Sequence, residues 1–465
     1  MYRWLLILLL PVLLVSCVAG KKNAYNTLPP AASLPALRES AINIPLNIVL
    51  TKFLANAQVL IPKEITSDGW PQYQQTSCDF HYKYRFIPGG FTFSCSNNQL
   101  QVKLGGAYQV AGEKCVCAFG KQTSPWIGGS CGFGKEPMRK TDIYIKSAVQ
   151  IQPGYTVRTR SFTDRVVAPE KCLVSVFNLD ITQQVLDSIK ASTNAFCYSL
   201  DSVLNSMDFA ATTRQLAQRI NQKIPLDVYG FLRINPSAVT ISPLNSKADS
   251  LQLILGISCY PEILSDSTNN FTASFLPPLQ SGSLVPGITV YSNARYDYPF
   301  LSTLLNRQVK DSTFRVEGHT VIIRNVSVSG AGEGKVEIAV DFEGDRKGTL
   351  FLAGTPLLDT ANQLIVIPDL DYSLKSKDLL LNLGKTFFSN KILKALREKA
   401  SVSISSVVEQ NRPSIDAQFN RVIREGVTTT GSFESVRIIA IVVGKETLQA
   451  QFVARANARI IITDL

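Results

Sequence analysis

The side chains that carry most enzyme chemistry are scarce in this sequence. It contains two histidines, His81 and His319, and only 18% of its residues are charged. The HExxH zinc motif, the Walker phosphate loop and zinc-finger spacings are all missing. These absences argue against metal-dependent and nucleotide-dependent enzymes, and they predict a protein with neither a cofactor nor a metal site.

Long hydrophobic runs are also missing after the N-terminal segment. No internal run reaches the ~18–20 apolar residues that a membrane helix needs. Yet 45% of the 465 residues are hydrophobic. A chain of this length can bury large cores and is expected to form two or more domains. Its apolar surface must therefore lie in cores or in cavities.

The net charge of +11 comes without any dense Lys/Arg run that is interleaved with aromatic residues. Nucleic acid is therefore not an expected partner. Two explanations of the charge remain open, a solvated basic surface and attraction to anionic membrane headgroups.

No cysteine follows Cys259, so the rest of the chain must rely on packing alone. Apart from Cys17, the cysteines are Cys78, Cys95, Cys115, Cys117, Cys131, Cys172, Cys197 and Cys259. An even number in an exported protein favours disulfides, whose pairing the sequence leaves open. Cys115 and Cys117 are unsuited to bond each other, because positions two apart on a strand are too distant. A zinc site with Cys115, Cys117, Cys131 and a fourth cysteine would lack a recognised ligand spacing.

The N-terminus predicts the compartment. A basic start at Arg3 precedes an apolar stretch from Trp4 to Val15, and residues 1–17 are typical of a signal peptide. Leu14-Val15-Ser16-Cys17 resembles a bacterial lipobox, in which the cysteine becomes lipidated; the alternative is an ordinary signal peptide with a chance cysteine. Stable anchoring requires more than one lipid chain, and lipidation of Cys17 would supply this. Val18 resembles the sorting signal of an outer-membrane lipoprotein, so we expect a periplasm-facing protein there.

Residues 18–40 contain several Pro, Ala and Ser residues and are expected to form a flexible tether. As a flexible coil this segment would span roughly 25 Å, and fully stretched it would reach about 75 Å. The folded body would then stand away from the membrane.

The second half of the chain repeats the plan of the first. The opening segment 42–57 contains Pro45 and is matched with 296–306, which contains Pro299. Each half then has a long helical pattern that is followed by two strands. Repeats of this kind decide the fold. We expect an α+β protein of two tandem repeats. Residues 41–262 form the first, 263–290 a Pro/Ser/Gly-rich connection, and 291–465 the second.

In the first half, short alternating stretches over 80–110 predict strands with turns at Pro88-Gly89-Gly90 and Ser96-Asn97-Asn98. Residues 111–140 are expected to be loop. Strands are expected at 142–150, 155–163 and 172–179. A helix is expected to follow, capped by Thr182 and broken near Asp208. Two strands, at 228–241 and 251–259, close this half.

In the second half, alternation predicts strands at 320–329, 334–343, 348–356 and 363–371. A helix is expected from Ser373 or Ser376 through Val402. Pro413 should interrupt it before a second piece that carries Val422 and Ile423. The last two strands are expected at 431–442 and 446–463.

One catalytic pattern matches by letters. Gly128-Gly129-Ser130-Cys131-Gly132 fits the G-x-S-x-G pattern of a nucleophile elbow, which needs a preceding strand and a following helix. Its surroundings predict a loop on both sides, so a chance turn is the better interpretation. Asp180 and Asp371 precede helices at matching positions, where capping explains them better than acid–base chemistry.

Residues 41–465 resemble the uncharacterised bacterial DUF4403 family, which has no established activity. Six segments carry this resemblance: Cys78-Asp79 with Tyr82-Lys83-Tyr84, Asp180-Ile181-Thr182, Ile234-Asn235-Pro236, Leu276-Pro277-Pro278-Leu279, Gly348-Thr349-Leu350 and Gly354-Thr355-Pro356. The duplicated plan is in turn similar to the tubular lipid-binding (TULIP) proteins, typified by bactericidal/permeability-increasing protein. That resemblance implies a curled antiparallel sheet around a long helix in each half.

The TULIP resemblance also implies an apolar groove for acyl chains. Its candidate lining residues are Ile44, Leu46, Phe53, Leu54, Phe300, Leu304, Leu305, Phe387 and Ile392. We therefore expect a membrane-anchored lipoprotein that binds or transfers lipid or another hydrophobic molecule. The alternatives are a non-catalytic structural or assembly factor of the envelope and, more weakly, a lipid hydrolase that acts through Ser130.

Overall fold

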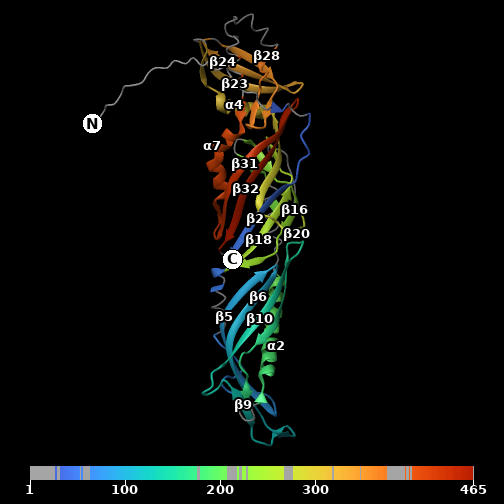
Figure 1. Cartoon of the computed structure of the whole chain (residues 1–465), viewed down its shortest axis with the longest axis vertical. Coiled ribbons are helices and arrows are strands. Elements are labelled where there is room, and N and C mark those ends of the chain that lie inside the picture. Colours follow the sequence, from blue (N-terminus) through green and yellow to red (C-terminus); the bar gives the residue numbers. More distant parts are fainter. Residues whose placement is uncertain are drawn as a thin grey trace, which may run out of the picture.

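The computed structural model shows an elongated rod in which sheets follow one another along the long axis (Figure 1). It describes residues 27–28, 32–52, 54–55, 63–174, 179–206, 217–218, 223–226, 229–265, 276–316, 319–345, 347–373, 393, 397 and 401–463. These residues form three helices among many strands. The expected α+β class is therefore confirmed, with sheet in large excess.

A twelve-stranded sheet occupies the middle of the rod and contains strands from both ends of the chain. Its principal strands are β2 (Ser40–Val49), β16 (Pro236–Ile241), β18 (Ser250–Cys259), β21 (Gly287–Asp297), β31 (Val427–Val443) and β32 (Thr447–Ile462). Shorter strands complete it: β14 (Ile224–Pro225), β15 (Phe231–Arg233), β17 (Asn245–Lys247), β19 (Glu262–Leu264), β20 (Leu279–Ser281) and β30 (Arg421–Arg424). Strand β2 runs antiparallel to β18 and parallel to β32, so the first long strand and the last one are neighbours.

A seven-stranded sheet forms the lower end of the rod in Figure 1. It comprises β3 (Ile65–Thr66), β4 (Gln74–Ser77), β5 (Phe80–Ser96), β6 (Gln99–Lys114), β9 (Ile127–Cys131), β10 (Arg139–Ile151) and β11 (Val157–Val167). Two small hairpins accompany it: β7 (Cys117–Ala118) with β8 (Lys121–Gln122), and β12 (Leu173–Val174) with β13 (Leu179–Asp180).

Helix α2 (Thr182–Asn205) covers the free edge of β11, which would otherwise expose unpaired backbone groups. Backbone N–H groups of alternate β11 residues donate to side-chain oxygens of the helix. The N–H of Ser161 donates to Asp201 at 2.5 Å, and that of Thr163 donates to Asn194 at 2.7 Å. The helix therefore replaces a neighbouring strand.

The upper sheet contains β22 (Thr313–Val316), β23 (His319–Gly332), β24 (Lys335–Gly344), β25 (Gly348–Gly354) and β28 (Asp371–Tyr372). Helix α4 (Tyr298–Val309) is capped by Asp297, whose carboxylate accepts from the Phe300 N–H. The Asn306 amide exchanges two hydrogen bonds with the Val326 backbone, at 2.6 and 2.7 Å. Side chains of a helix thus satisfy a strand edge here as well.

A four-stranded sheet packs over the upper part of β31 and β32. It contains β1 (Thr27–Leu28), β26 (Leu357–Asp359), β27 (Leu364–Val366) and β29 (Ser401–Ser403). Its Leu358 forms a buried cluster with Ile438, Ile441 and Ala450. Helix α7 (Ile404–Phe419) lies along β31. Within the segment 18–40, Thr27–Leu28 pair with β26 and the Pro35 carbonyl accepts from Gln451, so these described residues lie against the body.

Most of the expected strands are confirmed, but the turn expected at Pro88-Gly89-Gly90 is wrong. These residues form a bulge within the continuous strand β5, because glycine there permits close approach to β6. The turn at Asn97-Asn98 is confirmed, with both residues at positive φ. The loop expected over 111–140 is also wrong in part, since it contains β7, β8 and β9. Of the strand expected at 172–179, only Leu173–Val174 and Leu179 belong to described strands.

Thr182 begins α2 but does not cap it, because its hydroxyl accepts from the Cys172 N–H. The helix expected through Val402 is wrong at its end, where Ser401–Ser403 form β29. Pro413 does not interrupt α7 but lies within it, and Val422 and Ile423 belong to β30. Most of 374–400 and the break near Asp208 lie outside the described residues.

The residue match between 42–57 and 296–306 is wrong. Pro45 lies in the middle of β2, whereas Pro299 lies in the first turn of α4. Pro299 suits a helix start because its missing N–H would have no helical partner there. A strand followed by helical residues does occur at both places, since β2 precedes helical residues at 51–52 and 54–55, and β21 precedes α4.

Two disulfides confirm the expectation for the cysteines. They join Cys78 to Cys117 and Cys131 to Cys172, and Cys115 does not bond Cys117. Since Cys117 and Cys131 belong to different disulfides, the zinc alternative is wrong. Among the described cysteines, Cys95, Cys115, Cys197 and Cys259 are free thiols.

Candidate functional site: the apolar face of the central sheet

Strand β2 has one apolar and one mixed face. Ile42, Ile44, Leu46 and Ile48 alternate along it, and alternate residues of a strand point to the same side of the sheet. The intervening positions include Asn43 and Asn47. This strand therefore separates two environments.

The neighbouring strands extend the apolar side. In the register of the sheet, Leu46 lies opposite Leu253 of β18 and Ile460 of β32. Across the three strands, this apolar face comprises Ile42, Ile44, Leu46, Ile48, Leu251, Leu253, Leu255, Ile257, Ile460 and Ile462. Ten branched aliphatic side chains thus form one continuous surface.

Each of these ten side chains is half-buried, and none is fully buried. The three buried clusters that the described residues form lie elsewhere, around Leu358, around Tyr108 and around Leu352. Burying apolar surface stabilises a protein by roughly 25 cal/mol per Å². The part of this surface that stays accessible to water does not contribute that free energy. A contiguous apolar surface that stays partly accessible is a candidate interaction site.

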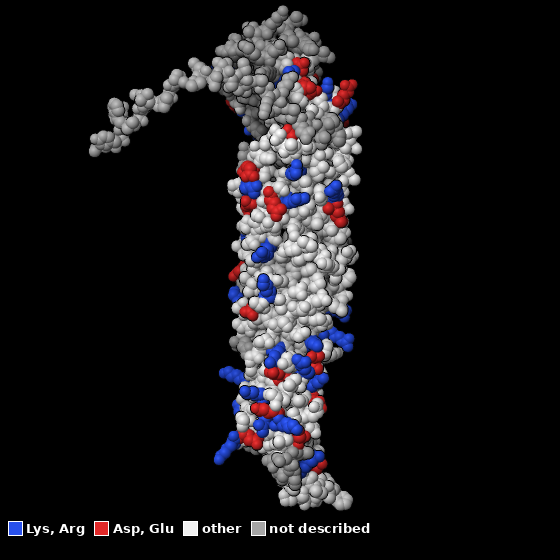
Figure 2. Space-filling model, viewed as in Figure 1, with Lys and Arg blue, Asp and Glu red and all other residues white. Residues whose placement is uncertain are grey.

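The opposite side of the same strands is mixed: it carries hydrogen-bonded amides beside apolar residues such as Pro45 and Ile254. The Asn43 amide donates to the Val285 carbonyl at 2.9 Å, and the Gln252 amide donates to Asn47 at 3.4 Å. Figure 2 shows that charged side chains are sparser over the middle of the rod than over the lower sheet.

The sequence-predicted groove residues divide into three groups. Ile44 and Leu46 belong to the apolar face, and the half-buried Leu54 follows β2 closely. Phe300, Leu304 and Leu305 lie on α4, which packs against β23. Phe53, Phe387 and Ile392 lie outside the described residues. The structure brings together only the β2 members.

Sequence reasoning missed eight residues of the apolar face. The signal was present, because Leu251, Leu253, Leu255 and Ile257 alternate as clearly as the β2 residues do. The sequence pattern does not predict which strands become neighbours, because β2 and β32 are separated by most of the chain.

At the lower end, an aromatic cluster surrounds one histidine. The His81 ring stacks on Trp126 and Tyr73, with centroids at 3.8 and 4.3 Å. Glu113 accepts from the Tyr73 hydroxyl and pairs with His81, each at 2.9 Å. The hydrogen bond to His81 is the main cause that lowers the pKa of Glu113, whereas burial and the bond to Glu113 raise that of Tyr73 to about 12.

The described residues place Ser130 at the end of β9, opposite Ala111 of β6. The next residue, Cys131, is bonded to Cys172, and the chain then continues through turns to β10. A nucleophile elbow requires a helix after the serine, and none follows in 131–151.

Asp180 accepts from the Thr182 N–H at the start of α2, as expected for a capping role. At Asp371, the carboxylate accepts from the Tyr372 N–H, and the helix expected after it lies outside the described residues.

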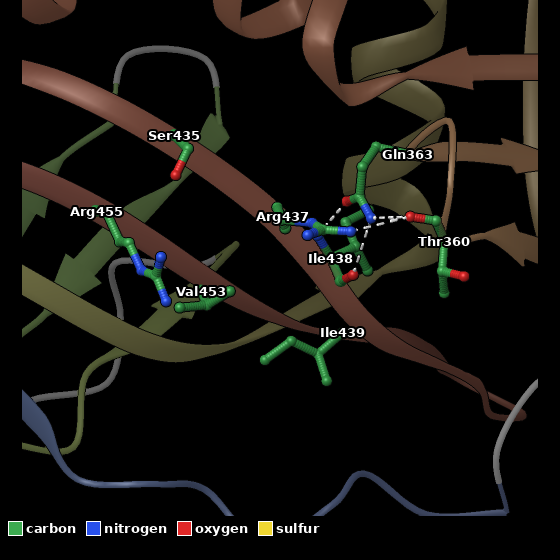
Figure 3. Close-up of a pocket in the computed structure, with 8 residues that line it drawn as sticks. All are labelled: Thr360, Gln363, Ser435, Arg437, Ile438, Ile439, Val453 and Arg455. Atoms are coloured by element: carbon green, nitrogen blue, oxygen red, sulfur yellow. Dashed lines mark hydrogen bonds between the residues drawn. The ribbon is translucent and has the colours of Figure 1, made fainter.

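Two cavities open on the surface. One, of about 320 Å³, lies where the turn between β26 and β27 meets β31 and β32, and is lined by Thr360, Gln363, Ser435, Arg437, Ile438, Ile439, Val453 and Arg455. In Figure 3 the Arg437 side chain reaches toward Gln363 and Thr360, whereas Arg455 stands apart. The other, of about 340 Å³, lies on the lower sheet beside the Lys146–Asp164 ion pair. Neither is lined by the apolar face.

Helices among the described residues are all too short or too polar to cross a bilayer. In those same residues, no group of three or more His, Cys, Asp or Glu side chains is placed to hold a metal ion.

Comparison with known proteins gives a family and distant structural likenesses. No curated protein matches the sequence. A crystal structure of lipopolysaccharide binding protein matches with a TM-score of 0.26 at 10% identity, over 92% of this chain and 100% of that chain. P47 from Clostridium botulinum A2 matches with a TM-score of 0.22 at 9% identity, over 89% and 96%. The family model described as a domain of unknown function (DUF4403) matches residues 38–462. The chain therefore belongs to the DUF4403 family, as the sequence motifs indicated.

Proposed function

We propose that this protein is a non-catalytic lipoprotein that binds or transfers lipid or another hydrophobic molecule along the apolar face of the central sheet. The observation that carries the proposal is the apolar face itself: ten aliphatic side chains, all half-buried, stand on three neighbouring strands. Such a surface needs a cover, and a hydrocarbon chain is a suitable one.

The energetics fit this use. Each methylene group that leaves water gains ~0.8 kcal/mol, so a lipid with ~30 chain methylenes resists transfer into water by roughly 20 kcal/mol. A lipid carrier therefore needs a long apolar surface and no reactive group. β2 supplies that surface along its whole length, because its four apolar residues share one side.

The proposal includes the architecture of tubular lipid-binding proteins, with two tandem units that each wrap a curled sheet around a long helix. Two observations support it. Helix α2 lies along β11 in the lower sheet, and α4 lies along β23 in the upper one. In both cases helix side chains bind the strand backbone.

The proposal also includes an anchor. Cys17 would carry the lipid chains, and the protein would face the periplasm from the outer membrane. The lipobox-like segment supports this, and mass spectrometry of the mature N-terminus tests it. An unmodified Cys17 in the protein isolated from membranes would contradict the anchor but leave the binding proposal intact.

The binding proposal is tested by lipid analysis of the full-length protein. Native mass spectrometry should find lipid or a hydrophobic molecule bound to the wild type, and the double variant Ile44→Thr/Leu46→Thr should lose most of it. Threonine has the β-branching that strands favour but places hydroxyl groups on the apolar face.

Asn47→Thr is the matched control, because it alters the mixed side of the same strand and should keep the ligand. The proposal fails if the wild type carries no hydrophobic ligand, or if the two variants lose it equally.

A second candidate function, docking of an envelope assembly partner, is favoured by one observation. Phe196, Tyr198 and Leu200 are exposed on α2. Phe196 and Leu200 lie one helical turn apart and so share a face. This exposed patch would suit a protein partner, and cross-linking from position 196 would identify it.

A further inference from the structure

A small hairpin projects from the lower sheet and displays an aromatic residue at its turn. β7 and β8 pair through Ala118 and Lys121, which leaves Phe119 and Gly120 as the two turn residues. Both have positive φ, 50° at Phe119 and 74° at Gly120. Such turns favour Gly or Asn at both positions. Turn formation therefore does not explain a phenylalanine at position 119.

The hairpin and its base carry three strongly exposed apolar side chains. Phe119 is 105% exposed, Val116 is 62% exposed and Ile127 is 61% exposed. Ile127 pairs with Lys114, two residues before Val116. The three therefore belong to one local structure, which we call the apolar tip: residues 114–127.

The apolar tip is held outward. The Cys78–Cys117 disulfide joins the hairpin to the segment before β5, and the Cys115 N–H donates to the Asp79 carbonyl. At the base, the Val116 N–H donates to the Ser124 hydroxyl at 2.8 Å. Because both sides of the hairpin are fixed, Phe119 is held away from the core of the lower sheet.

The charged residues within the apolar tip are of one sign. Residues 114–127 contain Lys114 and Lys121 and no acidic residue, and both lysines are exposed. Two acids lie at the base. The Asp79 carboxylate accepts from Ser77 at 2.6 Å, and Glu113 is bonded to His81 and Tyr73. A basic rim around exposed apolar side chains complements an anionic lipid surface, in which lysines meet headgroups and apolar groups meet acyl chains.

We propose that the apolar tip inserts Phe119 into the surface of an anionic lipid bilayer. A protein partner fits less well, because a stable protein interface buries roughly 800 Å² on each side, whereas these side chains stand on a narrow projection. Lipid accommodates a projection without a preformed pocket. The tip thus docks the rod on the bilayer that supplies or receives the hydrophobic ligand, an inference that deepens the proposed function.

The location of the tip gives this docking a direction. β9 lies at the lower end of the rod in Figure 1, whereas the first described strand, β1, pairs with β26 in the upper half. The first described strand, β1, and the apolar tip therefore lie toward opposite ends. A rod attached through its N-terminus would present Phe119 to a second lipid surface.

Site-specific fluorescence in the full-length protein tests the insertion. Phe119→Trp is mixed with vesicles that contain brominated phosphatidylglycerol, and its emission is compared with that of the wild type. The added tryptophan should shift to shorter wavelength and be strongly quenched by bromine. Vesicles of brominated phosphatidylcholine alone should quench it several-fold less, and so should adding Lys121→Glu.

Val285→Trp is the matched control, because Val285 is 78% exposed but lies beside the central sheet, where its carbonyl accepts from Asn43. It should show neither the shift nor the quenching. The inference is overturned if position 119 is quenched no more than position 285, or equally by both lipids. This readout does not depend on a ligand at the apolar face, so its failure and that of the proposed function are distinguishable.

Discussion

At the residue scale, Glu113 connects two aromatic neighbours at the base of the apolar tip. Its hydrogen bonds with His81 and Tyr73 hold its pKa below the ordinary value of 4.5. A carboxyl group whose pKa is lower in the folded state adds stability above its unfolded-state pKa. That stability is lost as the pH falls through the folded-state pKa.

We therefore predict that acid loosens this cluster in the wild type, with the loss developing as the pH falls below the ordinary carboxyl pKa of 4.5. Glu113→Gln should lower stability near neutral pH by about 1 kcal/mol, since the amide forms weaker bonds, and should remove this part of the acid dependence. Tryptophan fluorescence of the stack, followed with pH in both proteins, checks it. Equal acid transitions in the two would contradict the assignment.

Residue patterns in the sequence predicted local structure well and residue neighbourhoods poorly. Alternation gave most strands, and the two adjacent asparagines gave the turn between β5 and β6. Pro88-Gly89-Gly90 was misread because glycine serves bulges as well as turns. The apolar face was seen only at Ile44 and Leu46, because neighbours such as Ile460 are set by the tertiary fold.

At the element scale, helices close the edges of strands. α2 presents Asn194, Asp201 and Asn205 to the N–H groups of β11, and α4 presents Ser302 and Asn306 to β23. A helix in place of a strand stops the sheet without leaving a template for aggregation. The helix can also follow the long axis of the rod, as α2 does in Figure 1.

Asp201 is the central contact of this arrangement. Its carboxylate accepts from the Ser161 N–H, the Ser161 hydroxyl and the Thr159 hydroxyl. Asp201→Ala should lower the free energy of unfolding by about 2–3 kcal/mol, since bonds to a charged acceptor are lost and strand donors lose their partner.

Hydrogen exchange at the Ser161 amide should rise most in Asp201→Ala. Ser188→Ala is the control, because Ser188 bonds only the carbonyl of Gln184 within the same helix. A change below about 0.5 kcal/mol is expected there. Equal exchange in both variants would show that α2 is held by apolar packing alone.

At the scale of the whole molecule, β32 joins three strands of the central sheet. It pairs with β21 and β31 and runs beside β2. Ile460→Pro removes a ladder hydrogen bond in a central strand, where proline is poorly tolerated. We predict that the segment 40–49 then exchanges amide hydrogens faster, although it lies far away in sequence.

The control is Val422→Pro in the short strand β30, at a side chain that is largely exposed. It should loosen its own hairpin and leave 40–49 unchanged. Mass spectrometry of exchange in the peptide 40–49 distinguishes the variants. Unchanged protection in Ile460→Pro would mean that β18 and β21 hold β2 in place without β32.

The parallel pairing of β2 with β32 also affects the order in which the central sheet can form during synthesis. A ribosome releases β2 long before its partner β32. Until β32 emerges, the part of β2 at Leu46–Ile48 lacks its neighbour on that edge, whereas Ala41–Asn43 can already pair with β21. Contacts so distant along the chain form late and slowly, so the central sheet of a nascent chain is completed late. A chain truncated before β32 would leave Leu46–Ile48 of β2 without this partner strand.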